Sequence, residues 1–588
     1  MIGVRTGGLL FVAFALSLPS LAQSSKPVPS PKSEVRAVWM TTASGLDWPP
    51  STNRAEQQAS LRRIVLNLKT RGFNTIFFQV RARGDAYYRS RYEPWAENLT
   101  GVLGKDPGWD PLAFLLHEAH AQGMEVHAWM NVFKVRGPNP VQPSTPEHPS
   151  RALAGWCIEQ GGELWLDPGR PEVRRYLVEL VMDLVRSYDI DGINFDFVRY
   201  PGERFDDQQS YARYGRGIPL LEWRRRNITD FVREAHRQAT MVSPRLKTGA
   251  SPLGVYRDDA NGRQRGSFYG VSQDSHGWLR EGILDYLSPQ IYWMINPWNG
   301  EPDFARVANR WRELAAGRHV YAGIAAYRPE IQRDLGAYID TTRAANLQGH
   351  VFFRLESITP ATLPGGGYHM AANIPPMAWK DSIPPSPVTD LSVTEIAHGT
   401  YRLQWTQPGV AADGDTARYY NVYRWTVPHI PMHIPEARLA ITLPGELSYV
   451  DSTASDGRSR YFYAVTAFDR MHNESPPSPV VSTHTEPALV TRPASPSEPI
   501  TLGVAIEHET GLPTLVHYTL PVKTRVALDI ILRRTGIPDT LHAMLVRAVQ
   551  DEGTYKVNID NIRLPAGSYI LRLTTERNTL EQDLRVGP

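Results

Sequence analysis

The chain has 588 residues, a length that predicts about three or four domains of ordinary size. Its 63 basic and 61 acidic residues nearly cancel, so it lacks the basic excess that is typical of nucleic-acid-binding proteins. Its 15 Trp and 26 Tyr provide many rings that either fill cores or stack on sugars.

The N-terminus has the layout of a secretory signal peptide. Arg5 precedes an apolar run from residue 9 to 18, and Ser20-Leu21-Ala22 follows as a cleavage site between small residues. The run is too short to span a bilayer, and no later segment approaches the necessary length. We therefore expect residues 1–22 to be a signal peptide and the mature protein to be periplasmic, cell-surface or extracellular, with no membrane span. A retained N-terminal anchor is the alternative. Because Cys157 is the only cysteine, an exported chain has no internal disulfide.

Strand and helix patterns alternate between residues 34 and 355. Eight segments have the apolar or alternating pattern of strands, at 35–40, 74–80, 125–130, 192–197, 246–251, 286–292, 319–325 and 349–354. Amphipathic helical segments lie between them, at 54–71, 111–122, 171–188, 220–240, 304–315 and 329–345, with a weaker one at 273–281. Strand followed by helix, repeated eight times, predicts an α/β fold of the (β/α)8 TIM barrel class over residues 34–378. Insertions at 136–163 and 202–219 are expected to form walls around the site.

The composition changes after residue 378. A proline-rich linker, Pro384-Pro385-Ser386-Pro387, precedes short alternating segments at 391–394, 401–405, 419–425 and 460–467, which predict strands. The positions of Trp405 and Tyr461 resemble a fibronectin type III module, so residues 386–486 are assigned to such a β-sandwich. A second proline-rich linker at 487–499 leads to residues 500–588. These resemble the small Ig-like domains that end many secreted bacterial proteins, either as plain accessory modules or as sorting domains.

One predicted strand ends in a carboxylate and a cation. In the stretch Asp191-Gly-Ile-Asn-Phe-Asp-Phe-Val-Arg-Tyr-Pro201, residues 193, 195 and 197 share one face, and Asn194 and Asp196 share the other. Active sites of TIM barrels lie at the carboxyl ends of the strands, so Asp196 is the first candidate for a catalytic residue. The alternative is a structural Asp that caps the next helix or pairs with Arg199.

Several short motifs occur in one order along the barrel. They include Val35-Arg-Ala-Val-Trp39, Phe78-Gln-Val-Arg-Ala-Arg-Gly-Asp-Ala-Tyr87, Trp165-Leu-Asp-Pro-Gly169, Asp191-Gly-Ile-Asn-Phe-Asp196 and Ser288-Pro-Gln-Ile-Tyr-Trp293. This series resembles the glycosyl-hydrolase-like family of bacterial TIM-barrel proteins that is distantly related to glycoside hydrolase family 10. That family includes a cell-envelope glycosidase acting on peptidoglycan stripped of its stem peptides. The resemblance covers about residues 34–377 and implies an exported glycan hydrolase.

Glycoside hydrolysis usually needs two carboxylates that flank the scissile bond. Family members commonly carry a second acid directly after the residue that matches Asp196, whereas this chain has Phe197. The partner is therefore sought at other strand ends, where Glu356, Asp85 and Asp167 are candidates. Asp167 has the alternative role of a turn and helix-start residue, and Asp85 that of an ion-pair partner for a nearby arginine. Glu356 is the best placed by topology.

Other polar and aromatic side chains at predicted strand ends are candidate substrate contacts. These are Arg81, His127, Trp129, Asn131, Asn194, Arg199, Gln290, Tyr292 and Trp293. They offer hydrogen bonds to hydroxyl, acetamido or lactyl carboxylate groups, and the two Trp rings offer faces to a sugar. His127 has the alternative role of a packed histidine in the barrel interior.

Motifs for metals and cofactors are absent from the sequence. There is no His-Glu-x-x-His, paired-Cys or glycine-rich phosphate motif, and no G-x-S-x-G nucleophile elbow. The acidic pairs at 206–207 and 258–259 are interpreted as solvated turns and not as calcium sites. Together with the family resemblance, which implies a glycosidase, this leads us to expect an enzyme that acts on a polysaccharide without a cofactor. The alternative is a carbohydrate-binding or scaffold protein that keeps the barrel but has no turnover.

Overall fold

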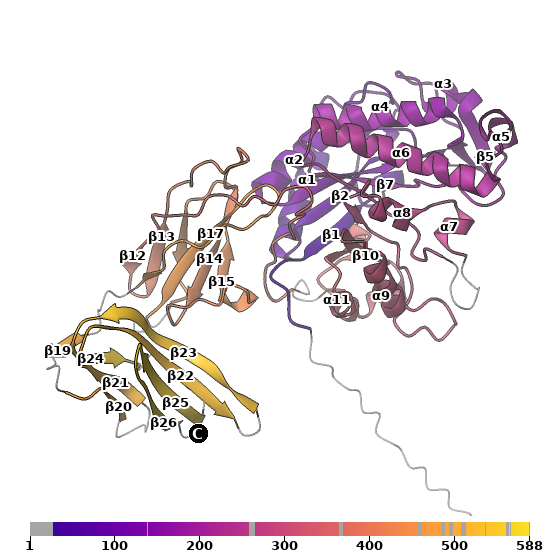
Figure 1. Cartoon of the computed structure of the whole chain (residues 1–588). Coiled ribbons are helices and arrows are strands. Elements are labelled where there is room, and N and C mark those ends of the chain that lie inside the picture. The colour runs from indigo at the N-terminus through magenta and orange to yellow at the C-terminus, as the bar shows by residue number, and fades with distance from the viewer. Residues whose placement is uncertain are drawn as a thin grey trace, which may run out of the picture.

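The structure, a computed structural model, describes residues 28–588 except 138, 258–264, 364–367, 455–459, 484–488, 493–497, 507–512, 535–536, 560–563, 565 and 587–588. The signal peptide predicted at residues 1–22 lies outside the described residues. Figure 1 shows a barrel surrounded by helices, followed by two units built from β-strands. Within the described ranges, no helix has both the length and the apolar character needed to cross a membrane.

The N-terminal unit is the predicted (β/α)8 barrel. Its eight parallel strands close in the order β1-β2-β3-β7-β8-β9-β10-β11, with β11 paired to β1. The strands are β1 Val35–Met40, β2 Thr75–Arg81, β3 Glu125–Asn131, β7 Gly192–Asp196, β8 Lys247–Ala250, β9 Tyr286–Leu287, β10 His319–Ile324 and β11 Gly349–Phe353. The strand expected at 286–292 is reduced to two residues. Pro289 has no backbone N–H, so the regular ladder stops there and only single bridges at Gln290 follow.

Helices cover the outside of the barrel (Figure 1). They are α1 Arg54–Thr70, α2 Pro111–Ala121, α3 Pro149–Ala152, α4 Pro171–Ser187, α5 Gln208–Tyr214, α6 Leu220–Val242, α7 Ser267–Gly270, α8 Ser275–Arg280, α9 Phe304–Leu314, α10 Pro329–Gln332 and α11 Leu335–Ala344. The single helix predicted at 329–345 is two helices. The Asp334 side chain accepts a hydrogen bond from the Ala337 amide and so starts a new helix after α10.

The insertion after β3 forms a small sheet that the sequence did not predict. Its strands are β4 Lys134–Arg136, β5 Cys157–Gln160 and β6 Glu163–Leu166, paired antiparallel in the order β4-β6-β5. Because β4 begins three residues after the carboxyl end of β3, this sheet stands at the mouth of the barrel.

Two β units follow the barrel, each with two antiparallel sheets. The first has a sheet of β12 Ser392–Ala397, β13 Thr400–Gln404 and β16 Ser448–Asp451, and a sheet of β15 Arg438–Ile441, β14 Tyr419–Trp425, β17 Phe462–Phe468 and β18 Val481–Ser482. The second has β19 Leu489–Arg492, β24 Gly553–Asn558, β21 Pro513–Leu520 and β20 Thr501–Ile506 in one sheet, and β23 Ile537–Gln550, β22 Thr524–Arg534, β25 Gly567–Thr575 and β26 Thr579–Val586 in the other.

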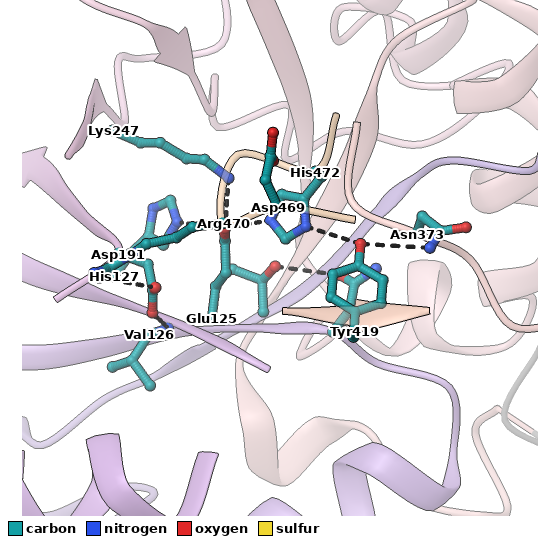
Figure 2. Close-up of polar contacts among 12 residues, drawn as sticks. Glu125, Val126, His127, Asp191, Lys247, Asn373, Tyr419, Asp469, Arg470 and His472 are labelled. Carbon is teal, nitrogen blue, oxygen red and sulfur yellow. Dashed lines mark hydrogen bonds and ion pairs between the residues drawn. The ribbon is translucent and has the colours of Figure 1, made fainter. Parts of the chain in front are cut away.

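The first β unit closes the amino-terminal end of the barrel. Met471, in the loop after β17, joins the apolar cluster of the barrel interior. Figure 2 shows the next residue, His472, between Glu125 of β3 and Tyr419 of β14. The His472 Nε2 lies 2.7 Å from a Glu125 oxygen, and the Lys247 ammonium lies 2.5 Å from the same oxygen. Because Glu125 and Lys247 begin their strands, only the opposite, carboxyl end of the barrel remains open for a site.

Candidate active site at the carboxyl end of the barrel

Asp196 is the last residue of β7 and lies at the mouth of the barrel. It is paired in register with Asn131, the last residue of β3, and only 8% of it is exposed. Its Oδ1 accepts a hydrogen bond of 2.7 Å from the Phe197 amide, and the Gln290 Nε2 lies 3.4 Å from the same oxygen. The sequence therefore predicted the position of this carboxylate at the strand end.

Burial raises the pKa of Asp196 above its ordinary value, because the ionised carboxylate loses solvation. The Phe197 amide, the Arg199 charge, the Trp129 indole and the Lys134 charge oppose this effect without cancelling it. None of the described Lys or Arg side chains forms an ion pair with Asp196. The carboxyl group therefore stays protonated to a higher pH than an exposed Asp, which is the property of a general acid.

Two cationic side chains near Asp196 contact the aromatic ring of Phe197. Lys134 Nζ lies 4.8 Å and the Arg199 guanidinium 5.1 Å from the centre of the Phe197 ring, and Arg199 also lies 5.6 Å from the Trp165 ring. Phe197 has a φ of 49°, a backbone conformation that bulky residues rarely adopt. Such strain occurs often at functional sites, and here it accompanies a ring that contacts both cations.

Glu163 is a mouth carboxylate that the sequence did not predict. It begins β6 and forms an ion pair with Lys134. Burial lowers the pKa of Arg199, and the charges of Asp196 and Glu163 oppose that shift, so both acids lie within electrostatic reach of one guanidinium. We call Lys134, Arg199 and Glu163 the charged wall. The one available signal was the short apolar run Leu164-Trp-Leu166 directly after Glu163, which is consistent with a strand.

The three partner carboxylates predicted from the sequence lie in other surroundings. The Glu356 side chain is 67% exposed and pairs with Arg354 at 2.8 Å. Asp85 accepts a 2.8 Å hydrogen bond from the Arg83 amide, within its own turn. Asp167 is buried and accepts a 2.9 Å hydrogen bond from the Gly169 amide just before α4, which fits its alternative role as a turn residue. Among the described residues, no hydrogen bond or ion pair joins any of the three to Asp196 or to the charged wall.

Several predicted substrate contacts gather around Asp196. Trp129, Asn131, Asn194 and Gln290 all lie on the interior face of the barrel near its mouth. Within the part of the chain that the structure describes, Asn131 Oδ1 and Asn194 Nδ2 are buried without a hydrogen-bond partner. Buried polar atoms usually have a partner, so these two atoms are available to a water or a sugar hydroxyl.

The remaining predicted contacts divide by depth. Tyr292 and Trp293 are partly exposed after β9. Arg81 is fully buried, and its Nε and Nη2 each lie 2.7 Å from a carboxylate oxygen of Glu93. His127 lies deeper, stacked on Phe77 at 4.9 Å and hydrogen-bonded to the Tyr286 hydroxyl at 2.7 Å. That placement matches the alternative role of His127 as a packed interior histidine.

The described residues contain one acidic group with the spacing of a metal site, and it is not at the mouth. It consists of Asp381, Asp413 and Asp415, in the linker and the first β unit. Arg245 lies 3.3 Å from Asp415 and 3.6 Å from Asp413, so a guanidinium already balances part of this charge.

A closed (β/α)8 barrel with a buried acid and a cluster of polar and aromatic side chains at its mouth is an arrangement of the glycoside hydrolase class. Residues 34–354 match the family described as Glycosyl hydrolase-like 10, and the chain belongs to this family.

Related proteins carry the same description. The chain is 31% identical over 507 residues to "Glycosyl hydrolase YngK" of Bacillus subtilis, a match that covers 79% of this chain and 96% of the relative. It is 34% identical over 337 residues to "Glycosyl hydrolase DigH" of Escherichia coli K12, covering 52% and 74%. Among solved structures, the PgaB (BpsB) glycoside hydrolase domain from Bordetella bronchiseptica is 14% identical with a TM-score of 0.43, covering 56% of this chain and 97% of that one.

Proposed function

We propose that this protein is an exported glycosidase that hydrolyses a cell-envelope or extracellular polysaccharide, with denuded peptidoglycan as the first substrate to test. The observation that carries the proposal is the buried carboxyl of Asp196 at the barrel mouth, whose pKa is raised by burial. The family of the chain supports glycoside hydrolysis as the reaction, and the pattern of residues 1–22 supports export.

In the proposed reaction, Asp196 is the general acid. It gives its proton to the glycosidic oxygen as the bond from that oxygen to the anomeric carbon breaks, which leaves positive charge on the sugar ring. A group that donates a proton must be protonated at the working pH, and the raised pKa of Asp196 meets this condition. Water completes the reaction by adding its oxygen to the anomeric carbon.

Glu163 is our candidate for the second carboxylate. It forms an ion pair with Lys134 at the mouth, where a carboxylate can stabilise the positive ring or take the proton from water. Arg199, beside them, is suited to bind an anionic sugar substituent such as a lactyl carboxylate.

The test is incubation of the full-length mature protein with denuded peptidoglycan, intact sacculi and a wider panel of glycans, followed by mass spectrometry of the released sugars. We expect product from the wild type and a loss of about 100-fold or more in rate for Asp196→Asn and Glu163→Gln. Glu356→Gln is the matched control, since it removes an exposed carboxylate at the same end of the barrel.

Full activity of Asp196→Asn would contradict the assignment of Asp196 as the acid. Full activity of Glu163→Gln together with an inactive Glu356→Gln would identify Glu356, which follows β11, as the second carboxylate. Retention of the protein on sacculi with no product from any glycan would instead identify a carbohydrate-binding protein.

A further inference from the structure

Three aromatic rings pack together on the side of the mouth away from the charged wall. Tyr292 follows β9, Tyr327 follows β10 and Phe353 ends β11. The ring of Tyr327 meets Tyr292 edge to face at 6.2 Å and Phe353 at 5.7 Å, and the rings of Tyr292 and Phe353 stack at 5.8 Å. These three strands lie beyond β8, whereas the charged wall comes from the chain that follows β3 and β7.

The aromatic group begins beside the catalytic acid. Burial raises the pKa of Tyr292 far above its ordinary value, and the charge of Asp196 adds to this, so the Tyr292 hydroxyl lies within the field of that carboxylate. Phe353 also meets Trp129 at 6.3 Å, and the Trp129 indole acts on the pKa of Asp196. From Asp196 the rings therefore run outward over β9, β11 and β10.

Two large aromatic side chains on this side of the mouth are exposed. Tyr327 is 49% exposed, and Trp298, in the loop from β9 to α9, is 87% exposed. Arg328 ties the two segments together, because its Nη1 donates a 2.6 Å hydrogen bond to the Tyr292 carbonyl and its Nη2 lies 3.5 Å from Glu301. Tyr327 packs on Tyr292 and Phe353 while about half of it stays exposed, so its ring presents a ready-made face to a ligand.

The occupant that fits these rings is a sugar. A pyranose has one face of C–H groups, which stacks on an aromatic ring, and an edge of hydroxyls, which stays in water. The other wall of the mouth carries charges and suits a different unit of the same chain. A polysaccharide that reaches both walls must pass over Asp196, between them.

We propose that Tyr327 and Trp298 form a sugar-stacking platform that binds a unit of the polysaccharide beyond the scissile bond. This proposal rests on the proposed function and adds its mode of action. The enzyme holds an internal stretch of chain across the mouth, and its efficiency rises with the length of the substrate up to the length that reaches the platform.

The test compares Tyr327→Ala and Trp298→Ala with the wild type, each as the full mature chain. The probes are peptide-free oligosaccharides of alternating N-acetylglucosamine and N-acetylmuramic acid, from the shortest that is cleaved to the longest that is soluble. We expect kcat/KM of the wild type to rise with length. Each variant should lose about three- to tenfold on the long probes, through KM, and nothing on the shortest, in line with the modest energy of one ring contact.

Two controls separate stacking from folding. Tyr327→Phe keeps the ring and should keep the full length dependence. Met241→Ala removes another exposed apolar side chain, 72% exposed at the end of α6 and therefore at the closed end of the barrel, and should change nothing.

Equal losses of Tyr327→Ala on short and long probes, or no loss on either, would overturn the platform and leave Asp196 and the proposed function standing. If the wild type cleaves none of these probes, its dissociation constant for the longest one is measured against that of Tyr327→Ala. Weaker binding by the variant supports the platform and equal binding overturns it. No binding by the wild type overturns the platform for this polymer and removes denuded peptidoglycan as the substrate, while the wider glycan panel still tests the glycosidase proposal.

Discussion

Arg81 is the residue at which a role in substrate binding and a role in stabilising the fold lead to the most different predictions. The sequence predicts it as a contact at a strand end, but its guanidinium is buried and makes two 2.7 Å bonds to Glu93. Its Nη1 also donates to the carbonyl oxygens of Asn131 and Val132, which hold the end of β3 next to Asp196. Both side chains of the pair are 0% exposed. Removal of one partner from such a buried pair costs about 3–5 kcal/mol, because the other charge stays buried without compensation.

The perturbation is Arg81→Met, and the expected effect is a lower melting temperature. At about 2.1 cal/mol/K per residue, the barrel of residues 34–354 unfolds with an entropy of about 0.7 kcal/mol/K. A loss of 3–5 kcal/mol therefore lowers the midpoint by about 4–7 °C, measured by scanning calorimetry of the full chain at one fixed scan rate. The double variant Arg81→Met with Glu93→Gln removes both charges and should melt above the single variant.

Arg199→Gln is the control for a cation at the mouth. Arg199 is not part of a buried ion pair, so its removal should lower activity and shift the midpoint by no more than about 1–2 °C. If Arg81→Met has the melting temperature of the wild type but loses activity, the buried pair does not stabilise the fold and Arg81 contacts the substrate, as the sequence predicts.

Three further predictions concern charge. Arg199 lowers the pKa of Asp196, so Arg199→Gln should raise it and move the basic limb of the profile of kcat/KM against pH to higher pH; an unmoved limb would contradict Asp196 as the acid. Burial raises the pKa of Asp469 from its ordinary value of 3.8 to about 6. The contribution of this group to the stability of the fold is therefore fully present below about pH 3.8 and is lost as the pH rises through about 6. The difference in melting temperature, Asp469→Asn minus wild type, should therefore increase between about pH 4 and 7, because only the wild type loses this contribution. A difference that stays constant over this range would refute the shift. His472→Ala removes one partner of the buried Glu125, so it should cost about 1–3 kcal/mol and speed limited proteolysis between the barrel and the first β unit; unchanged cleavage would show that the contact does not hold the units together.

Most of the barrel could be predicted from the sequence because each buried parallel strand has a nearly continuous apolar pattern followed by an amphipathic helix. The failures occur where local chemistry overrides that pattern. Pro289 stops the ladder of β9, and Asp334 starts a second helix inside what looks like one amphipathic segment. The sheet of β4, β5 and β6 was missed because its strands are only three or four residues long, too short to show a clear period in the sequence.

The sequence could predict which side chains face the barrel interior, but not how far each lies from the mouth. Alternation along a strand tells which residues face the interior, and it correctly groups His127 with Trp129 and Asn131. It does not tell how far each one lies from the mouth, nor that the chain after β2 brings Glu93 back onto Arg81. Glu163 was out of reach for a related reason, because an insertion and not a barrel strand carries it to the mouth.

The two ends of the barrel show why burial alone does not define an active site. Glu125 at the closed end and Asp196 at the open end are both buried acids on the interior face, and burial raises the pKa of each. Lys247 touches Glu125, and His472 and His127 hydrogen-bond to it, so its pKa falls well below the ordinary value and the group is a fixed anion. The cations near Asp196 contact an aromatic ring and not the carboxylate, so its pKa stays raised. The acid whose charge is left uncompensated is the one that can exchange a proton with a substrate.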